Sequence, residues 1–293
     1  MGSTVVQSKR DIEAILASAG LRPDKHLGQH FLIDGNLMRK LLASAEIAPG
    51  DAVLEVGGGT GGLSDLLAAE AERLVVVEID HDLAPLLQAR YADQPHVSVL
   101  HMDVLANKST IDPLVLATLS EEAAPGAADR RYLLVANLPY HVATPLLMNL
   151  LTATPRFARM CFTIQLEVAD RLFAQAGSRD FGPLAIVVQT ACTLRRIAQL
   201  PPQAFWPPPK VASSMIRLDH QPHDFEQEGQ LAAFSGLVRA AFAHRRKTVR
   251  YNLARYLNEQ DLATALTIVD GQERAERIGL DTWITLGKAL LNL

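Results

Sequence analysis

The chain has 293 residues, of which 48% are hydrophobic and 20% are charged, and this composition excludes a wholly disordered protein. A formal net charge of −4 does not indicate a nucleic-acid-binding protein, so such a role would depend on local basic clusters. Cys161 and Cys192 lie in apolar stretches and are expected to be buried thiols, with no disulfide and no metal site. Because no apolar run has membrane-spanning length and no signal-peptide pattern is present, we expect a cytoplasmic protein that does not act at a membrane.

Two helices are expected near the N-terminus. The first begins at a capping motif at Ser8 and closes at Gly20, and the second covers residues 36–45. Between them, residues 25–32 follow neither a helical nor a strand period. This segment fits an arm packed over a sheet as well as a ligand contact, and the sequence leaves both interpretations open.

A glycine-rich turn is a candidate cofactor site. The apolar strand expected at residues 52–56 runs directly into Gly57–Gly62, and a helix begins at Leu63. A glycine turn between a strand and a helix lets a ligand approach the backbone and meet the N-terminus of the helix.

Two acidic residues follow the next two strands. Glu78 comes directly after a strand at residues 74–77, and Asp103 follows a strand at residues 97–100. The carboxyl ends of parallel strands meet at one edge of a sheet, and an acid about twenty residues beyond a glycine turn can bind ribose hydroxyls. A single acid at such a position is usually a helix cap, but the repeated pattern favours a binding site.

The stretch Asn137–Tyr140 carries the most specific chemistry in the chain. It follows an apolar strand at residues 132–136 and should lie at the carboxyl end of that strand, where open α/β sheets bind ligands. The amide oxygen of Asn137 and the carbonyl of Leu138 offer two hydrogen-bond acceptors, and Tyr140 offers a flat aromatic face. This set suits the exocyclic amine of a planar base. Taken alone, the tetrapeptide would be interpreted as a capped strand-to-helix turn.

The following residues predict the rest of a sheet and a rigid loop. Strands are expected at residues 160–165, 193–200 and 212–218. A proline-rich loop at residues 205–210 should hold its aromatic residues in place, either in the core or facing a ligand. Residues 120–130 are expected to form a surface excursion for which the sequence indicates no function.

The C-terminal part is expected to be helical and to follow a polar linker at residues 220–229. An apolar stripe at helical spacing runs from Val238 to Leu257. Most charge clusters are solvated faces, but an acid-free basic cluster in an acidic chain also suits the neutralisation of phosphates. The cluster consists of Arg239, Arg245, Arg246, Lys247 and Arg250.

The glycine turn also satisfies the dinucleotide pattern G-x-G-x-x-G and cannot by itself distinguish NAD from S-adenosylmethionine. The distinguishing features are Glu55 before the glycines, the acid at Asp103, and the stretch Asn137–Tyr140. A hydride-transfer enzyme has no use for the last of these, whereas an adenine N6-methyltransferase does.

With these motifs the chain resembles the small-subunit (16S-type) ribosomal RNA adenine N6,N6-dimethyltransferases, from Lys25 to about Leu257. The resemblance rests on Gly28–Leu32, Glu55–Gly61, Glu78–Asp80, Asn137–Tyr140, Phe205–Val211 and Arg245–Arg250. It implies an α/β fold of the Rossmann-like class I methyltransferases, with a seven-stranded, mostly parallel sheet. The catalytic domain would cover residues 1–220, with an N-terminal helical arm at 1–48, and a small all-helical RNA-binding domain would cover 221–293.

The resemblance also implies an activity. Methyl groups would pass from S-adenosylmethionine to two adjacent adenosines in the 3′-terminal hairpin of small-subunit ribosomal RNA during ribosome biogenesis. The partner would be this RNA or the immature small subunit, and the protein would be a monomer without a metal. Catalysis would involve Asn137, Leu138, Pro139 and Tyr140, with Phe205 on the second face of the target base.

Further site residues are implied by the same resemblance. The cofactor would contact His30, Leu32, Glu55, Gly57, Gly59, Glu78, Asp103 and Asn137. RNA would contact Arg245, Arg246, Lys247 and Arg250. Two positions depart from the family pattern: Gly58 replaces a common proline and should loosen the turn, and Leu166 replaces a basic residue and should remove one RNA contact.

Three alternatives remain at this level. They are a large-subunit ribosomal RNA adenine N6-methyltransferase of the antibiotic-resistance type, a non-catalytic ribosome-assembly factor on the same fold, and an NAD-dependent dehydrogenase. The segments Phe205–Val211 and Arg245–Arg250 favour the small-subunit enzyme over its large-subunit relative. The intact stretch Asn137–Tyr140 argues against lost catalysis.

Overall fold

The computed structural model of the protein describes residues 6–24, 26–121 and 130–293. The helices are α1 (Lys9–Ser18), α2 (Gly35–Ala45), α3 (Ser64–Ala68), α4 (Leu83–Arg90), α5 (Pro113–Ser120), α6 (Ala143–Leu151), α7 (Leu166–Leu172), α8 (Pro183–Ala191), α9 (Gln230–Ala241), α10 (Val249–Leu253), α11 (Glu259–Ile268) and α12 (Leu280–Leu291). The strands are β1 (Phe31–Leu32), β2 (Ala52–Val56), β3 (Arg73–Glu78), β4 (Val97–His101), β5 (Leu105–Asn107), β6 (Thr110–Ile111), β7 (Tyr132–Asn137), β8 (Phe157–Gln165), β9 (Cys192–Leu200), β10 (Phe205–Trp206) and β11 (Ser213–His220).

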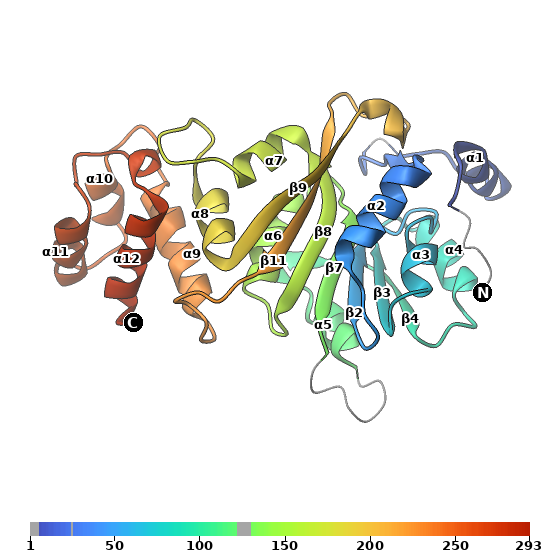
Figure 1. Cartoon of the computed structure of the whole chain (residues 1–293), viewed down its shortest axis with the longest axis horizontal. Helices are drawn as coiled ribbons and strands as arrows, with labels where there is room; N and C mark the ends of the chain where they lie inside the picture. Colours follow the sequence, from blue (N-terminus) through green and yellow to red (C-terminus); the bar gives the residue numbers. More distant parts are fainter. Residues whose placement is uncertain (1–5, 25, 122–129) are drawn as a thin grey trace. The chain divides into compact units, whose positions relative to one another are not determined.

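The chain divides into two compact units, and Figure 1 labels the helices and the strands of the main sheet. The first unit comprises the residues up to Leu166 together with Arg195–Asp219, and the second comprises Glu167–Leu194 and His220–Leu293. The expected boundary near residue 220 is therefore one of three crossings between the units, and the other two follow Leu166 and Leu194. Helices α7 and α8 group with the C-terminal helices. The assignment of catalysis and RNA binding to separate domains stays a prediction.

The central sheet has seven strands in the order β4-β3-β2-β7-β8-β11-β9. Strands β4, β3, β2, β7 and β8 pair in parallel, whereas β11 pairs antiparallel with β8. This confirms the predicted α/β fold with a mostly parallel sheet. The strand order reverses between β2 and β7, and open α/β sheets bind ligands beyond the carboxyl ends of the strands at such a reversal.

The inner strands are mostly apolar because helices cover both faces of a parallel sheet, although β2 also carries the buried Glu55. All five residues of β2 are buried, as are the four central residues of β7. Helix α2 adds Met38, Leu41 and Leu42 to the same core. Polar side chains are therefore left for the strand ends, where the site lies.

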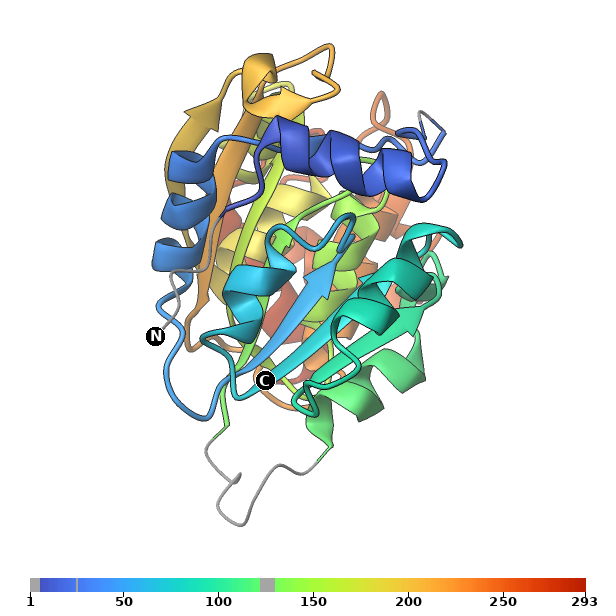
Figure 2. The same cartoon turned by 90° about the vertical axis from the view of Figure 1, so that its right-hand side faces the viewer.

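The N-terminal arm lies across the carboxyl ends of the strands, as Figure 2 shows for α1. Helix α1 starts with the expected capping box, formed by the side chains and backbone N–H groups of Ser8 and Asp11. Its residues Ile12 and Leu16 pack with Phe31. Strand β1 follows and pairs antiparallel with β10. The arm is thus held at the edge of the sheet where ligands bind.

The second unit has its own aromatic core. The rings of Phe225 and Phe234 stack with centroids 4.4 Å apart, and Trp283 is fully buried. The predicted apolar stripe from Val238 to Leu257 does not lie on one helix, because α9 ends at Ala241 and α10 begins only at Val249. The connection between the two helices carries Arg245, Arg246 and Lys247, whereas Arg239 lies in α9 and Arg250 in α10.

Several smaller predictions can be compared with the structure. Cys161 and Cys192 are buried thiols, as expected. Helix α5 and the pairing of β5 with β6 were not predicted. Residue 25 and most of the excursion at 120–130 lie outside the described residues. In the described part of the chain, no helix is long and apolar enough to span a bilayer.

Candidate functional site

A cavity opens where the strand order reverses. It encloses about 790 Å³, including the part open to solvent. Its walls come from five separate segments of the first unit: Leu27–Phe31, Val56–Gly57 with Gly59, Val77–Ile79, Met102–Val104 and Asn137–Val142. A smaller cavity of about 430 Å³ on the same measure shares Phe31, Gly57, Gly59 and Asn137 with it.

The glycine turn forms part of the floor of both cavities. Gly57 and Gly59 have φ values of 84° and 58°, in the left-handed region that glycine adopts without strain. A Cβ atom would lie 3.1 Å from Pro139 Cγ at position 57, and 3.0 Å from Phe31 Cε1 at position 59. These two glycines therefore allow Pro139 and Phe31 to close over the turn.

Gly58 does not loosen the turn as its departure from the family pattern suggested. A Cβ atom at this position would lie 2.5 Å from Val76 Cγ1 and 2.8 Å from Leu87 Cδ1. Both neighbours are core side chains with little room to move. In this chain, glycine at position 58 is thus the residue that fits the packing beneath the turn.

The two predicted acids lie at the same edge of the sheet and line the larger cavity. Glu78 is only 5% exposed, and its carboxylate accepts the N–H groups of Gly59 at 2.7 Å and Asp80 at 2.9 Å. Burial raises the pKa of Glu78. Asp103 is exposed at the rim and accepts the N–H of Leu105 at 2.9 Å. Each carboxylate retains acceptor capacity for a ligand.

Glu55 lies beside the smaller cavity and is only 1% exposed. Its Oε2 atom has no hydrogen-bond partner among the described residues. Burial raises the pKa of Glu55 well above its usual value, and the nearby Glu78 adds to this effect. The described residues that line the two cavities include no lysine or arginine. A ligand that carries positive charge would therefore meet no lysine or arginine among the described residues of either cavity.

Asn137 is held at the end of β7 by two hydrogen bonds. Its Nδ2 donates to the carbonyl of His30 at 2.9 Å, and its Oδ1 accepts from the hydroxyl of Thr163. Thr163 is fully buried and pairs in register with Asn137 on the adjacent strand β8. Together the two bonds fix which end of the amide is the acceptor. Sequence reasoning missed Thr163, although it is a single hydroxyl in an apolar strand.

Tyr140 is also fixed in position. Its hydroxyl shares a 2.8 Å hydrogen bond with Ser213 Oγ, and its ring lies 5.7 Å from that of His30 at an interplanar angle of 31°. Burial raises the pKa of Tyr140. The Nδ1 atom of His30 donates to the carbonyl of Pro207 at 2.7 Å, since a carbonyl can only accept. The Tyr140 ring therefore lines the cavity in a defined orientation.

Phe205 does not lie where the resemblance placed it. Its side chain is only 2% exposed, packs in the core and lines neither cavity. The cause is the pairing of β10 with β1, which sets Phe205 opposite Leu32. Of the two positions considered for the aromatic residues of the proline-rich loop, Phe205 therefore has the one in the core. Its assignment as the second face that stacks on the target base is not supported.

The other predicted site residues fall into two groups. Each of the eight residues predicted to contact the cofactor lines at least one of the two cavities. Leu32 and Glu55 line only the smaller one. Leu138 and Pro139 join Asn137 and Tyr140 in the larger one. The four predicted RNA-binding residues are exposed in the second unit, and no acid in the described chain forms an ion pair with them.

Two solved structures share the fold of this chain. A dimethyladenosine transferase from Plasmodium falciparum matches with a TM-score of 0.68 and 21% identity, over 88% of this chain and 96% of the other. The 23S rRNA methyltransferase ErmE matches with a TM-score of 0.59 and 23% identity, over 89% and 99%. The fold by itself therefore does not distinguish between RNA substrates.

Sequence comparison is more specific. A ribosomal RNA small subunit methyltransferase A from Geobacillus kaustophilus is 38% identical over 289 residues, which cover 95% of this chain and 94% of the relative. A protein of the same description from Lactiplantibacillus plantarum is 36% identical over 284 residues, with coverages of 94% and 93%. The model of the family described as ribosomal RNA adenine dimethylase matches residues 21–290. The chain belongs to the ribosomal RNA adenine dimethylase family.

Proposed function

We propose that this protein dimethylates, at N6, two adjacent adenosines in the 3′-terminal hairpin of small-subunit ribosomal RNA. The observation that carries the proposal is the convergence of Asn137, Leu138 and Tyr140 with the glycine turn in one cavity. The identity of 36–38% with two small-subunit enzymes, over nearly the whole chain, supports the small subunit as the substrate.

The residues that line the cavities fit S-adenosylmethionine as the methyl donor. Gly57 and Gly59 line both cavities, Glu78 can accept ribose hydroxyls, and Asp103 can accept an adenine amine. The described residues that line the two cavities include no lysine or arginine to repel the positive charge of this cofactor, and the unpartnered oxygen of Glu55 can accept a hydrogen bond from it. When bound, the cofactor supplies an electrophilic methyl group on a positively charged sulfur.

Asn137 and Leu138 orient the amine of the target adenine. This amine is a weak nucleophile because its lone pair is delocalised into the ring. The Asn137 amide oxygen and the Leu138 carbonyl accept its two N–H hydrogens and favour a pyramidal nitrogen with a directed lone pair. Thr163 uses one lone pair of the Asn137 oxygen and leaves the second for the substrate.

Tyr140 holds the base and takes no part in proton transfer. Its raised pKa keeps the phenol neutral, and the proton of the amine leaves to water after methylation. A base must leave the RNA stack to reach the cavity, and stacking on one aromatic ring contributes roughly 1–3 kcal/mol. The second methylation needs a pocket that accepts a methyl group on the same nitrogen.

RNA binding is assigned in this proposal to Arg245, Arg246, Lys247 and Arg250, and the protein acts as a cytoplasmic monomer on the immature subunit. Each phosphate contact that is lost reduces the slope of log affinity against log salt by about 0.7–0.9. The double variant Arg246→Glu and Lys247→Glu should therefore bind RNA more weakly and with a flatter salt dependence. An unchanged slope would show that these two residues are a solvated face.

Transfer of labelled methyl groups tests the proposed reaction. S-adenosylmethionine is supplied with immature small subunits that lack the modification, and purified large subunits serve as the control substrate. We expect labelled N6,N6-dimethyladenosine only in the small-subunit RNA. Label in the large subunit would support the antibiotic-resistance type of activity, and no label in either would contradict a methyltransferase function.

A further inference from the structure

The N-terminal segment makes a reciprocal contact with the glycine turn. Gln7 Nε2 donates to the carbonyl oxygen of Thr60 at 2.9 Å, and the hydroxyl of Thr60 donates to Gln7 Oε1 at 2.8 Å. Both side chains are only 6% exposed. Gln7 therefore satisfies the backbone and the side chain of one residue in the turn, from a position 53 residues earlier in the chain.

The same segment forms part of a cavity wall. Gln7 and Ile12 line the smaller cavity, together with Glu55 and the glycines of the turn. A Cβ atom at Gly62 would lie 3.3 Å from Gln7 Oε1, so the turn and the segment fit closely. The capping box at Ser8 and the packing of Ile12 on Phe31 hold α1 in place behind Gln7.

This wall lies outside the part of the chain that the family model matches, which begins at residue 21. The larger cavity holds Glu78 and Asp103, the acids suited to a ribose and an adenine. The smaller cavity has the glycine turn, Leu32 and Glu55 on its walls. It can therefore take the other end of the cofactor, which carries an amino and a carboxylate group.

We infer that Gln7 is a positioning residue of the cofactor site, and that residues 7–12 form the wall around the amino-acid end of the methyl donor. The inference rests on the proposed function. The paired hydrogen bonds hold the glycine turn in a single conformation before the cofactor arrives. Binding then loses less conformational freedom than it would with a free turn.

The variant Gln7→Leu tests this role because it removes both hydrogen bonds at similar side-chain size. We expect the dissociation constant for S-adenosylhomocysteine, measured by calorimetry, to rise about fivefold, the equivalent of one hydrogen bond. Thr60→Val removes only the hydroxyl bond and should give a smaller rise, whereas Thr60→Ser should bind like the unchanged protein. Gln203→Leu replaces an exposed glutamine of the same unit and serves as the matched control.

Limited proteolysis gives a second readout that needs no catalysis. In Gln7→Leu, the N-terminal segment should be cleaved faster, and S-adenosylhomocysteine should protect it less than in the Gln203→Leu control. A Gln7→Leu protein that binds S-adenosylhomocysteine as tightly as the control would overturn the inference, even if its melting temperature fell. If the unchanged protein failed to bind S-adenosylhomocysteine, the proposed function would fall first and the inference with it.

Discussion

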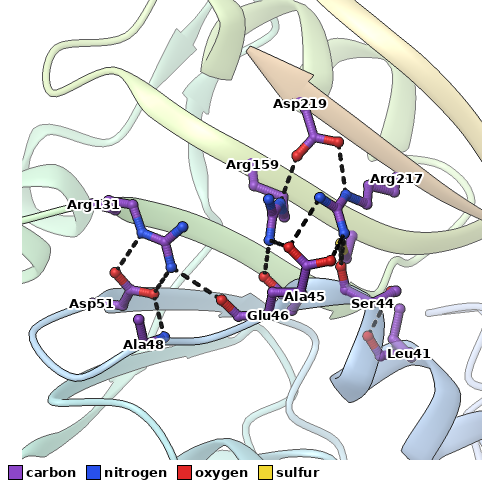
Figure 3. Close-up of polar contacts among 11 residues, drawn as sticks. Leu41, Ser44, Ala45, Glu46, Ala48, Asp51, Arg131, Arg159, Arg217 and Asp219 are labelled. Atoms are coloured by element: carbon purple, nitrogen blue, oxygen red, sulfur yellow. Dashed lines mark hydrogen bonds and ion pairs between the residues drawn. The ribbon is translucent and has the colours of Figure 1, made fainter.

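The two edges of the parallel sheet differ in how their acidic side chains are paired. Acids at the amino-terminal edge form ion pairs with arginines, whereas the described lining of the two cavities at the carboxyl-terminal edge contains no lysine or arginine. At the amino-terminal edge, Glu46 and Asp219 each accept hydrogen bonds from both Arg159 and Arg217, with donor–acceptor distances of 2.6–3.2 Å (Figure 3). Arg131 forms a similar pair with Asp51 nearby. At the carboxyl-terminal edge, the described residues that line the two cavities include acids but no lysine or arginine.

This contrast also appears in the pKa values. Hydrogen bonds from Arg217 and the charge of Arg159 lower the pKa of Glu46 to about 2. Burial acts to raise the pKa of Asp219, but hydrogen bonds from the same arginines lower it overall. Glu55 and Glu78 lack such partners, and burial raises the pKa of both. One edge is a completed network that stabilises the fold, and the other keeps polar atoms available for ligands.

The largest effect is expected at the carboxyl-terminal edge, for Asn137→Ala. Removal of a positioned hydrogen-bonding group from a reaction centre typically lowers kcat about 100-fold or more. Affinity for S-adenosylhomocysteine should fall much less, because the other lining residues remain. Single-turnover methyl transfer and calorimetry measure the two quantities. A variant that transfers methyl groups at the unchanged rate would remove Asn137 from the mechanism.

At the amino-terminal edge, the variant Arg217→Met should lose stability but keep its affinity for the cofactor product. This change removes the hydrogen bonds to Glu46, Asp219 and the Ser44 carbonyl, and it should lower the free energy of unfolding by about 2 kcal/mol. Chemical denaturation measures the loss, with the exposed Arg195→Met as control. Affinity of the folded protein for S-adenosylhomocysteine should not change. If Arg217→Met lost affinity for S-adenosylhomocysteine without losing stability, the amino-terminal edge would serve ligand binding and not the stability of the fold.

The pH dependence of stability should have opposite signs at the two edges. Glu55 has a raised pKa, so it stays protonated when the unfolded chain has ionised, and stability falls as the pH rises above about 4.5. Glu55→Gln should reduce this decline between pH 5 and pH 8. Glu46 has a lowered pKa, and its contribution is present above about 4.5 and is lost as the pH falls towards about 2. Denaturation curves in which Glu55→Gln steepened the decline would contradict the assignment.

The smallest effect is expected for Thr163→Val. This near-isosteric change removes the hydroxyl that fixes the amide of Asn137, and kcat should fall about fivefold, the equivalent of one hydrogen bond. Thr163→Ser restores the hydroxyl and should recover most of the rate. Equal rates for the Val and Ser variants would show that β7 alone orients the amide.

Local patterns were sufficient to predict the elements that position the site. The apolar runs of β2 and β7 and the capping box of α1 depend on neighbours in sequence, and the structure confirms them. The positions and roles of Phe205, Thr163 and Gln7 could not be predicted in this way, because they depend on contacts with residues far away in the chain.

The residues of the predicted stripe after Val238 are largely buried, but the break between α9 and α10 was missed for a related reason. Asn252 Nδ2 donates to the carbonyl of Ala241 at 2.7 Å and so closes a turn that helical periodicity does not reveal. Thr248 then caps α10. A periodic apolar pattern records which side chains are buried, but it does not record where the backbone turns between two helices.

A crystal structure with S-adenosylhomocysteine bound is the most direct test of the proposed cofactor site. We expect the ligand to span both cavities, with its ribose hydroxyls on Glu78, its adenine amine near Asp103, and its amino-acid end beside the glycine turn and Gln7. The aromatic face of Tyr140 and the amide oxygen of Asn137 should stay open to the RNA. A ligand bound elsewhere, or one that leaves Glu78 without contact, would contradict the account.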